Sequence, residues 1–141
     1  MDKERFVLPR EMWEQMVAHA RREDPNEACG ALAGKGSHAQ RLYPLTNTER
    51  SPYRYMTDPK ELYQAMKDAE RSGLEIIAFY HSHTHTPAYP SPTDVRLATW
   101  PEAYYLIISL QDKASPVVRA FRIQDGRVRE VPLDIVPPSQ G

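Results

Sequence analysis

The chain has 141 residues and a formal net charge of -1, with 40% hydrophobic and 26% charged residues. This length and balance favour one compact globular domain and exclude a disordered chain. The near-zero charge excludes a net electrostatic field that would recruit nucleic acid or an anionic membrane, so we expect neither as a partner.

The N-terminal third of the chain predicts one helix followed by strands. Apolar residues recur at three- and four-residue spacing from 9 to 23, which is typical of an amphipathic helix, and Pro9 suits its first position. Short apolar or alternating runs at 28–34 and 38–45 predict two strands joined by a glycine-containing turn. The alternation in 52–57 favours a third strand.

A second helix and a buried strand are expected next. Residues 58–73 carry a full set of helix signals, with Asp58 as N-cap, Glu61 at the capping-box position and a glycine just past the end. The nearly continuous apolar run 75–80 is typical of a central strand covered on both faces. It leads directly into the segment HSHTHTPAYPSPTD, which starts at His81.

The C-terminal part predicts a short helix and three strands. Ser91 is expected to be the N-cap of a helix over 91–100, ahead of a proline at the first helical position. A buried strand is expected over 103–110, and strands over 116–123 and 128–133 should form a hairpin. The element order indicates an α/β (α+β) domain with helices packed on a mixed sheet.

The histidine-rich segment is the candidate metal site. If the chain stays extended there, side-chain alternation puts His81 and His83 on one face, where both can bind one ion. Asp94 can supply a third ligand if the proline-rich loop folds back, and two histidines with one carboxylate and a water are typical of catalytic zinc. The spacing also allows solvated histidines and an aspartate that merely caps its helix.

A metal hydrolase also needs a general base, and no glutamate adjoins the histidines. Glu27, at the start of a predicted strand, could reach the metal from a neighbouring strand. A solvated loop position explains this residue equally well, so the residues alone leave its role open. Cys29 is a lone cysteine among small residues, and we expect a buried thiol that acts as a compact hydrophobe.

The residues at 81–83, followed by Ser91 and Asp94, with Glu27 well upstream, resemble the motif of the JAMM (MPN-plus) metalloprotease family. Every fixed position of that motif is filled. Further stretches, including HARREDPNEACGALAG, NTERSP and AYYLIISL, are similar to the short bacterial branch of the family, and the resemblance covers roughly residues 6–136.

The resemblance implies a single JAMM domain over 1–136, and the prolines and polar residues at the end of the chain predict a frayed tail over 137–141. Its expected fold is a curved mixed sheet flanked by helices, related to the cytidine deaminases. It further implies one Zn²⁺ ion per chain, held by two histidines and an aspartate of the motif. Those ligands are His81, His83 and Asp94.

By the same resemblance Glu27 is the general acid/base and Ser91 helps to bind the developing oxyanion. Within the family the chain looks most like the hydrolases that release cysteine from the C-terminal Gly-Gly tail of a ubiquitin-like sulfur-carrier protein, in cysteine biosynthesis. The alternatives are a JAMM deconjugase that cleaves isopeptide-linked adducts and a non-catalytic MPN scaffold. The scaffold is disfavoured because no position of the motif is missing.

Three residues near the site have weaker assignments. Arg50 and Arg54 could bind the carboxylate of the released cysteine, although surface arginines are the simpler interpretation. His85 has no counterpart among the family's ligands and is expected at the rim. Because no apolar run approaches the ~20 residues of a membrane helix and no signal-peptide pattern opens the chain, we expect a cytoplasmic protein.

Overall fold

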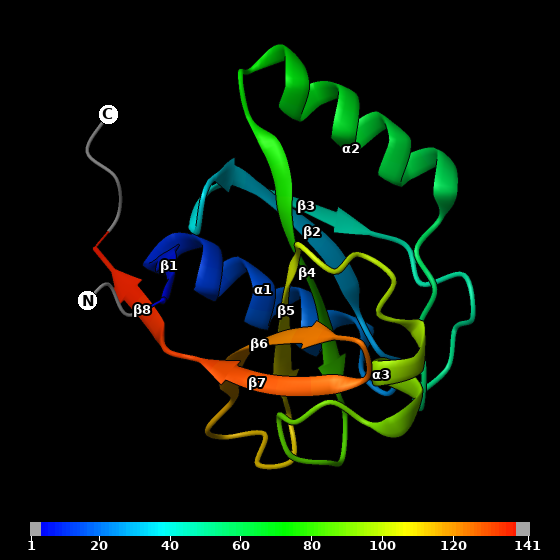
Figure 1. Cartoon of the computed structure of the whole chain (residues 1–141). Helices are drawn as coiled ribbons and strands as arrows, with labels where there is room; N and C mark the ends of the chain where they lie inside the picture. Colours follow the sequence, from blue (N-terminus) through cyan, green and yellow to red (C-terminus); the bar gives the residue numbers. More distant parts are fainter. Residues whose placement is uncertain (1–3, 138–141) are drawn as a thin grey trace.

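A computed structural model describes residues 4–137 of the chain and shows helices on both faces of one curved, mixed sheet (Figure 1). Within these residues, eight strands pair in the order β7-β6-β5-β4-β2-β3-β1-β8. The strands are β1 (Phe6–Pro9), β2 (Cys29–Lys35), β3 (His38–Leu45), β4 (Glu75–His83), β5 (Tyr104–Ser109), β6 (Val117–Gln124), β7 (Arg127–Val131) and β8 (Leu133–Val136). The helices are α1 (Arg10–Glu23), α2 (Pro59–Arg71) and α3 (Pro92–Leu97). This architecture confirms the predicted fold class.

The central strand β4 brings distant parts of the chain together. It pairs antiparallel with β2, with Cys29 opposite His81, and parallel with β5 on its other side. The parallel pairs β4–β5, β1–β3 and β1–β8 make the sheet mixed. Because β2 begins at Cys29, Glu27 lies two residues before the strand that pairs with the histidine-bearing end of β4.

Successive side chains of β4 point to opposite faces of the sheet. Tyr80 joins the core beneath α1, together with Met16 and Leu106, whereas Phe79 joins a second core with Tyr105 on the face that carries α2 and α3. His81 and His83 share the parity of Phe79 and therefore face this second side. The fold thus decides which helices surround the histidines.

Several predicted elements differ from the structure. Residues 52–57 do not form a strand, since this part of the chain makes only an isolated bridge between Asn47 and Thr57. Asp58 caps α2 as expected, but Glu61 is no capping-box partner, because its carboxylate instead accepts hydrogen bonds from the N–H and hydroxyl of Thr46 at 2.7 and 2.8 Å. The helix at 91–100 is shorter than predicted and ends at Leu97.

Two short strands at one end of the sheet, β1 and the edge strand β8, were not predicted. Each has four residues, too few for a clear alternation, and they pair in parallel across the whole sequence with Phe6 opposite Leu133. Pro9 ends β1 and forms the N-cap of α1 rather than its first residue. The predicted tail, 137–141, lies outside the described residues apart from Pro137. None of the helices between residues 4 and 137 has the length and apolar character to cross a membrane.

Candidate metal centre

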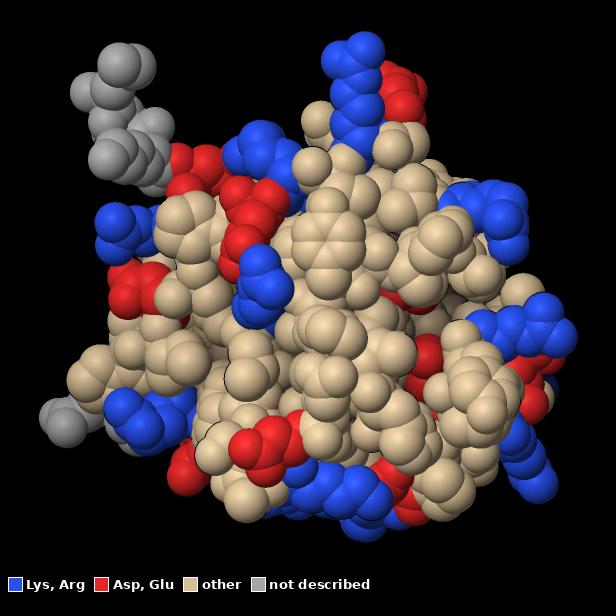
Figure 2. Space-filling model, turned by 90° about the horizontal axis from the view of Figure 1, so that it is seen from below, with Lys and Arg blue, Asp and Glu red and all other residues tan. Residues whose placement is uncertain are grey.

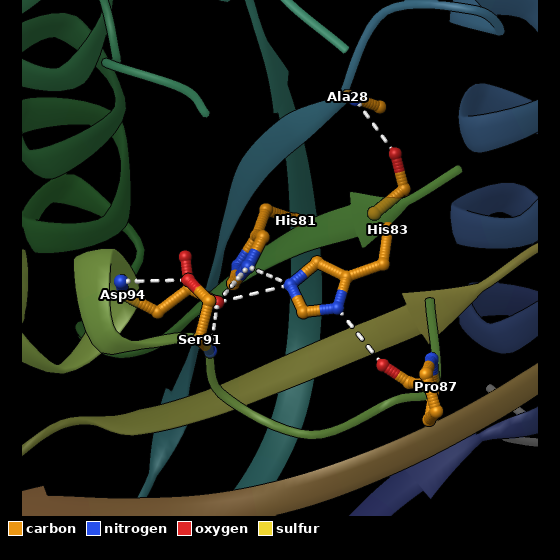
Figure 3. Close-up of polar contacts among 7 residues, drawn as sticks. Ala28, His81, His83, Pro87, Ser91 and Asp94 are labelled. Atoms are coloured by element: carbon orange, nitrogen blue, oxygen red, sulfur yellow. Dashed lines mark hydrogen bonds and ion pairs between the residues drawn. The ribbon is translucent and has the colours of Figure 1, made fainter. Parts of the chain in front are cut away.

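The end of β4 and the start of α3 bring three ligand atoms to one point. The chain is extended through His81 and His83, as the alternation required, and their Nε2 atoms lie 3.2 Å apart. Asp94 Oδ2 lies 3.0 Å from the first and 2.9 Å from the second Nε2 atom. Figure 3 shows both imidazoles reaching from β4 toward Asp94 and Ser91. The structure therefore brings together the three residues predicted as ligands.

A capping box places Asp94. The hydroxyl of Ser91 accepts a hydrogen bond from the Asp94 N–H at 3.0 Å, and Asp94 Oδ2 accepts one from the Ser91 N–H at 2.9 Å. Pro92 holds the first helical position, where a missing N–H costs nothing. The carboxylate of Asp94 thus caps α3 and is also the candidate metal ligand. The two interpretations of this residue, as helix cap and as ligand, are compatible.

The chemistry of these donors fits a divalent cation. The three ligand atoms lie within 4.8 Å of one another, and all three side chains are buried. His83 contacts the carbonyl oxygen of Pro87 through Nδ1 at 2.9 Å, and with the hydrogen on Nδ1 its Nε2 lone pair faces the centre. Two imidazoles and one carboxylate, with no thiolate, are the ligand set of catalytic rather than structural zinc sites.

The charges of the three groups are set by burial and by one another. Burial lowers the pKa of His81, which keeps its imidazole neutral. Burial also opposes ionisation of Asp94, but its contacts with His81 and His83 and the hydrogen bond from the Ser91 N–H together outweigh burial and hold the pKa of Asp94 well below its usual range. Burial acts against the charged form of His83 as well, yet its hydrogen bonds to Asp94 and Pro87 raise its pKa. An anionic carboxylate therefore sits between two imidazoles.

Glu27 lies in the pocket next to the ligands. It is only 4% exposed, and burial, reinforced by the charge of Asp94, raises its pKa to about 8. Among the described residues its Oε1 atom has no hydrogen-bond partner. The pocket holds about 140 Å³ and is lined by Glu27, Pro52, Tyr53, His83, Thr84, His85, Thr86 and Ser91. A buried carboxyl with a free oxygen is suited to exchange protons with a group that enters this pocket.

The segment carrying Glu27 is anchored to β4 and to a loop. Ser82, between the two histidines, accepts a hydrogen bond from the N–H of Ala28 at 2.8 Å through its hydroxyl, and its own N–H donates to the Ala28 carbonyl at 3.0 Å. Figure 3 shows the contact at Ala28. The middle residue of the HSH string thus positions the segment that precedes β2.

A second cleft is bordered by Tyr55, which contacts His81. The ring of Tyr55 stacks on this imidazole, with centroids 4.5 Å apart and planes 22° apart. Tyr55 lines this cleft of about 280 Å³ with aromatic, aliphatic and threonine side chains, together with Met56, Thr57, Leu62, Phe79, Leu97, Thr99, Trp100 and Tyr105. The sequence interpretation missed Tyr55, whose alternation with Tyr53 was attributed to a strand that does not form.

The residues with weaker assignments lie at the margins of the site. The Arg54 side chain is 64% exposed and pairs with Glu49 at 3.5 Å, and neither Arg54 nor Arg50 lines the Glu27 pocket. His85 does line it, as an exposed residue whose Nδ1 lies 2.8 Å from the Thr84 hydroxyl. Cys29 is fully buried, and burial raises the pKa of its thiol to about 12, which confirms a compact buried thiol.

Comparison with known proteins matches residues 9–124 to the model of prokaryotic homologs of the JAB domain. A CysO-cysteine peptidase of Mycobacterium tuberculosis is 47% identical over 136 residues, which cover 93% of this chain and 91% of that protein. A probable TtuB-protein conjugate cleaving protease of Thermus thermophilus is 39% identical over 123 residues, covering 86% and 78% of the two chains. A solution structure from Desulfitobacterium hafniense has a TM-score of 0.85 at 40% identity and covers 96% and 94%.

A mixed sheet that presents two histidines and an aspartate at one point, beside a buried carboxyl group, is the arrangement of a metallopeptidase-type hydrolase. The matched family model spans most of the chain, and named peptidases are similar to it along nearly their whole length. The chain belongs to the prokaryotic branch of the JAB/MPN domain family and is a hydrolytic enzyme of the JAMM type. The predicted family is thereby confirmed.

Proposed function

We propose that this protein is a zinc-dependent peptidase that hydrolyses the amide after the C-terminal glycine of a ubiquitin-like sulfur-carrier protein and releases cysteine. The observation that carries the proposal is the convergence of His81, His83 and Asp94 near a buried oxygen of Glu27 that has no hydrogen-bond partner within residues 4–137. The 47% identity to a CysO-cysteine peptidase supports the choice of substrate.

His81, His83 and Asp94 would hold the metal ion. A Zn²⁺ ion held by them would act as a Lewis acid and make the attacking water easier to deprotonate near neutral pH. Glu27 takes the proton that the attacking water loses and delivers it to the departing amine, so that the C–N bond breaks to a carboxylate and an amine. Burial raises the pKa of Glu27 to about 8 in the metal-free protein, and a cation bound beside it would lower this pKa toward the neutral range, where a group both accepts and returns a proton readily.

Ser91 would stabilise the oxyanion. Its hydroxyl oxygen already accepts the hydrogen bond of the Asp94 N–H, which leaves its own hydrogen free to donate. The hydroxyl lines the same pocket as Glu27, so that donor and proton carrier border one space. A donor fixed before the negative charge develops lowers the barrier without reorganisation.

The carrier would reach the site as an extended Gly-Gly tail, since glycine permits the close approach that a narrow pocket requires.

Figure 2 shows the underside of the molecule, where basic and acidic side chains lie interspersed around an area of other residues. Such a face suits a protein partner better than the phosphate backbone of a nucleic acid. Arg50 or Arg54 would contact the cysteine carboxylate only at the rim, because both lie outside the lining of the Glu27 pocket.

Intact-mass analysis tests the proposal. The organism's sulfur-carrier protein with a C-terminal cysteine is incubated with zinc-loaded enzyme, with chelated enzyme and with zinc-loaded Glu27→Gln enzyme. We expect loss of one cysteine in the first sample alone. No loss with verified zinc occupancy would refute cysteine release.

A second substrate class is supported by the 39% identity to a probable TtuB-protein conjugate cleaving protease. Here the leaving amine is a lysine side chain of a protein instead of a free amino acid. The same mass analysis with a carrier linked to a lysine-containing peptide distinguishes this isopeptide substrate from the cysteine adduct. Faster cleavage of the isopeptide than of the cysteine adduct would favour this alternative.

A further inference from the structure

The loop between β3 and α2 is organised by one buried side chain, that of Asn47, which is only 5% exposed. Its Nδ2 donates to the carbonyl oxygens of Glu27 and Arg54, at 3.0 and 3.1 Å. Its Oδ1 accepts from the N–H groups of Glu49 and Met56, at 3.0 and 3.1 Å. All four hydrogen-bonding positions of the amide are used.

The orientation of this amide is fixed by its partners. Two carbonyl oxygens can only accept, and two backbone N–H groups can only donate. A flipped Asn47 would set its NH₂ group against both N–H groups and its oxygen against both carbonyls. The amide therefore has a defined direction, with its NH₂ group toward Glu27 and its oxygen toward the turn of the loop.

The same loop holds the backbone of Glu27 from both sides. The Glu27 carbonyl accepts from Asn47, and the Glu27 N–H donates to the carbonyl of Ser51 at 2.9 Å. Strand β2 begins two residues later, at Cys29, so no sheet ladder fixes this residue. The hydrogen bonds between Ala28 and Ser82 hold the next residue against β4, but Glu27 itself is held by the loop, and the loop depends on Asn47.

The loop also reaches the other side of the site. Between residues 47 and 57 it carries Tyr55, which stacks on His81, and Tyr53, which lines the pocket of Glu27. The three ligand atoms, in contrast, come from β4 and α3, to which Asn47 makes no hydrogen bond among the described residues. Loss of the Asn47 amide should then displace the proton carrier and leave the ligand set in place.

We propose that Asn47 is a positioning residue for Glu27: its amide fixes the distance between the proton carrier and the reacting bond. This inference rests on the proposed function, in which Glu27 protonates the leaving amine. Misplacement of a reacting group by about 1 Å can lower a rate on the order of 100-fold. We expect the Asn47→Ala enzyme to lose at least about tenfold in kcat on an amide, with little change in KM or in zinc content.

Two substrates with different leaving groups distinguish a positioning role of Asn47 from a purely structural one. Their relative rates of hydrolysis change only if the proton carrier is misplaced. In the amide the C–N bond breaks only as nitrogen receives a proton, which Glu27 supplies. In a thioester of the same glycine the C–S bond breaks to a thiolate, which leaves without a proton because thiols are far stronger acids than amines are as N–H acids (the cysteine thiol ionises near ~8.5). A misplaced Glu27 should therefore slow amide hydrolysis more than thioester hydrolysis, whereas loss of folded enzyme lowers both rates equally.

The experiment compares two substrates, the carrier ending in glycyl-cysteine and the carrier as its mercaptoethanol thioester, each corrected for hydrolysis without enzyme. The variants are Asn47→Ala and Asn47→Asp, with Thr48→Ala as matched control. Thr48 donates its exposed hydroxyl to the Met56 carbonyl at 3.1 Å, a bond within the loop that does not involve Glu27. The Glu27→Gln enzyme gives the ratio of amide to thioester rate that is expected when the proton carrier is lost completely.

The ratio of the amide rate to the thioester rate decides the outcome, because the fraction of folded enzyme cancels from it. A ratio at least threefold below wild type in either Asn47 variant, and unchanged in the Thr48 variant, supports the inference. A smaller change in both Asn47 variants overturns it. If the wild-type enzyme fails to cleave the amide at all, the proposed function itself has failed, which is a distinguishable result.

Discussion

Replacement of Glu27 by glutamine should stabilise the metal-free protein while it removes activity. The folded protein buries this carboxyl so that its pKa rises to about 8, against an ordinary value of 4.5. Between those two values the folded state retains a proton that the unfolded state has released, so the free energy of unfolding falls as pH rises. Glutamine carries no titratable proton and escapes this dependence.

The magnitude follows from the pKa difference. Each pH unit above the ordinary pKa of 4.5 lowers the free energy of unfolding by about 1.4 kcal/mol until the folded pKa is passed. At pH 7 the effect amounts to roughly 3 kcal/mol, and it vanishes below about pH 4.5. A bound cation would favour the charged carboxylate and reduce the difference.

Urea unfolding of the metal-free wild type and Glu27→Gln protein from pH 5 to pH 8 measures this effect. The difference between the two free energies of unfolding should grow with pH, and Glu14→Gln, at an exposed position of α1, controls for the loss of a surface charge. A constant difference would refute the reasoning, because a pH-independent term reports only altered packing. Activity of the zinc-loaded variant should fall by ~100-fold or more, the usual contribution of general acid–base catalysis.

Three further predictions concern the oxyanion donor and the core. Ser91→Ala should lower kcat/KM by ~100-fold. Since the cap to Asp94 is lost, the substitution should also lower the free energy of unfolding by ~1 kcal/mol. A kcat/KM within threefold of wild type would rule out the oxyanion role. In Gly30→Ala the new Cβ would overlap the buried ring of Tyr80, so thermal unfolding should show a loss of ~1–3 kcal/mol, and an unchanged melting temperature would contradict the packing. Burial lowers the pKa of His19, which lies 2.7 Å from the Tyr80 hydroxyl, so the folded state binds fewer protons and stability should decrease as pH falls through about 6.5. His19→Gln should remove that decrease in chemical unfolding at pH 5 and 7, and its persistence would point to another group.

Local patterns were sufficient where structure is decided by neighbours in the sequence. The three- and four-residue spacing predicted α1, and the caps Asp58 and Ser91 marked the starts of α2 and α3. The extended HSH string predicted correctly that His81 and His83 share a face. These features depend on backbone geometry over a few residues, and a sequence displays that geometry directly.

Other features depend on partners far away in the chain. The alternation at 52–57 predicted a strand, but no neighbouring strand is there to pair with it, and Asn47 instead ties this segment into a loop. The strands β1 and β8 exist because they meet each other across the whole sequence. A pattern of six residues contains no information about such pairing.

The sequence by itself indicated the three metal-ligand candidates, because His81, His83 and Asp94 lie within one short segment, and the resemblance of the whole motif pointed to the family. The residues alone left Glu27 undecided between a solvated acid and a proton carrier until a resemblance was invoked. Only the tertiary structure placed that carboxyl in the pocket, through the antiparallel pairing of β2 with β4 and the hydrogen bonds of Asn47. The physical reason is that burial, which raises the pKa of Glu27 and leaves its oxygen unpaired, is a property of contacts between segments and not of any one segment.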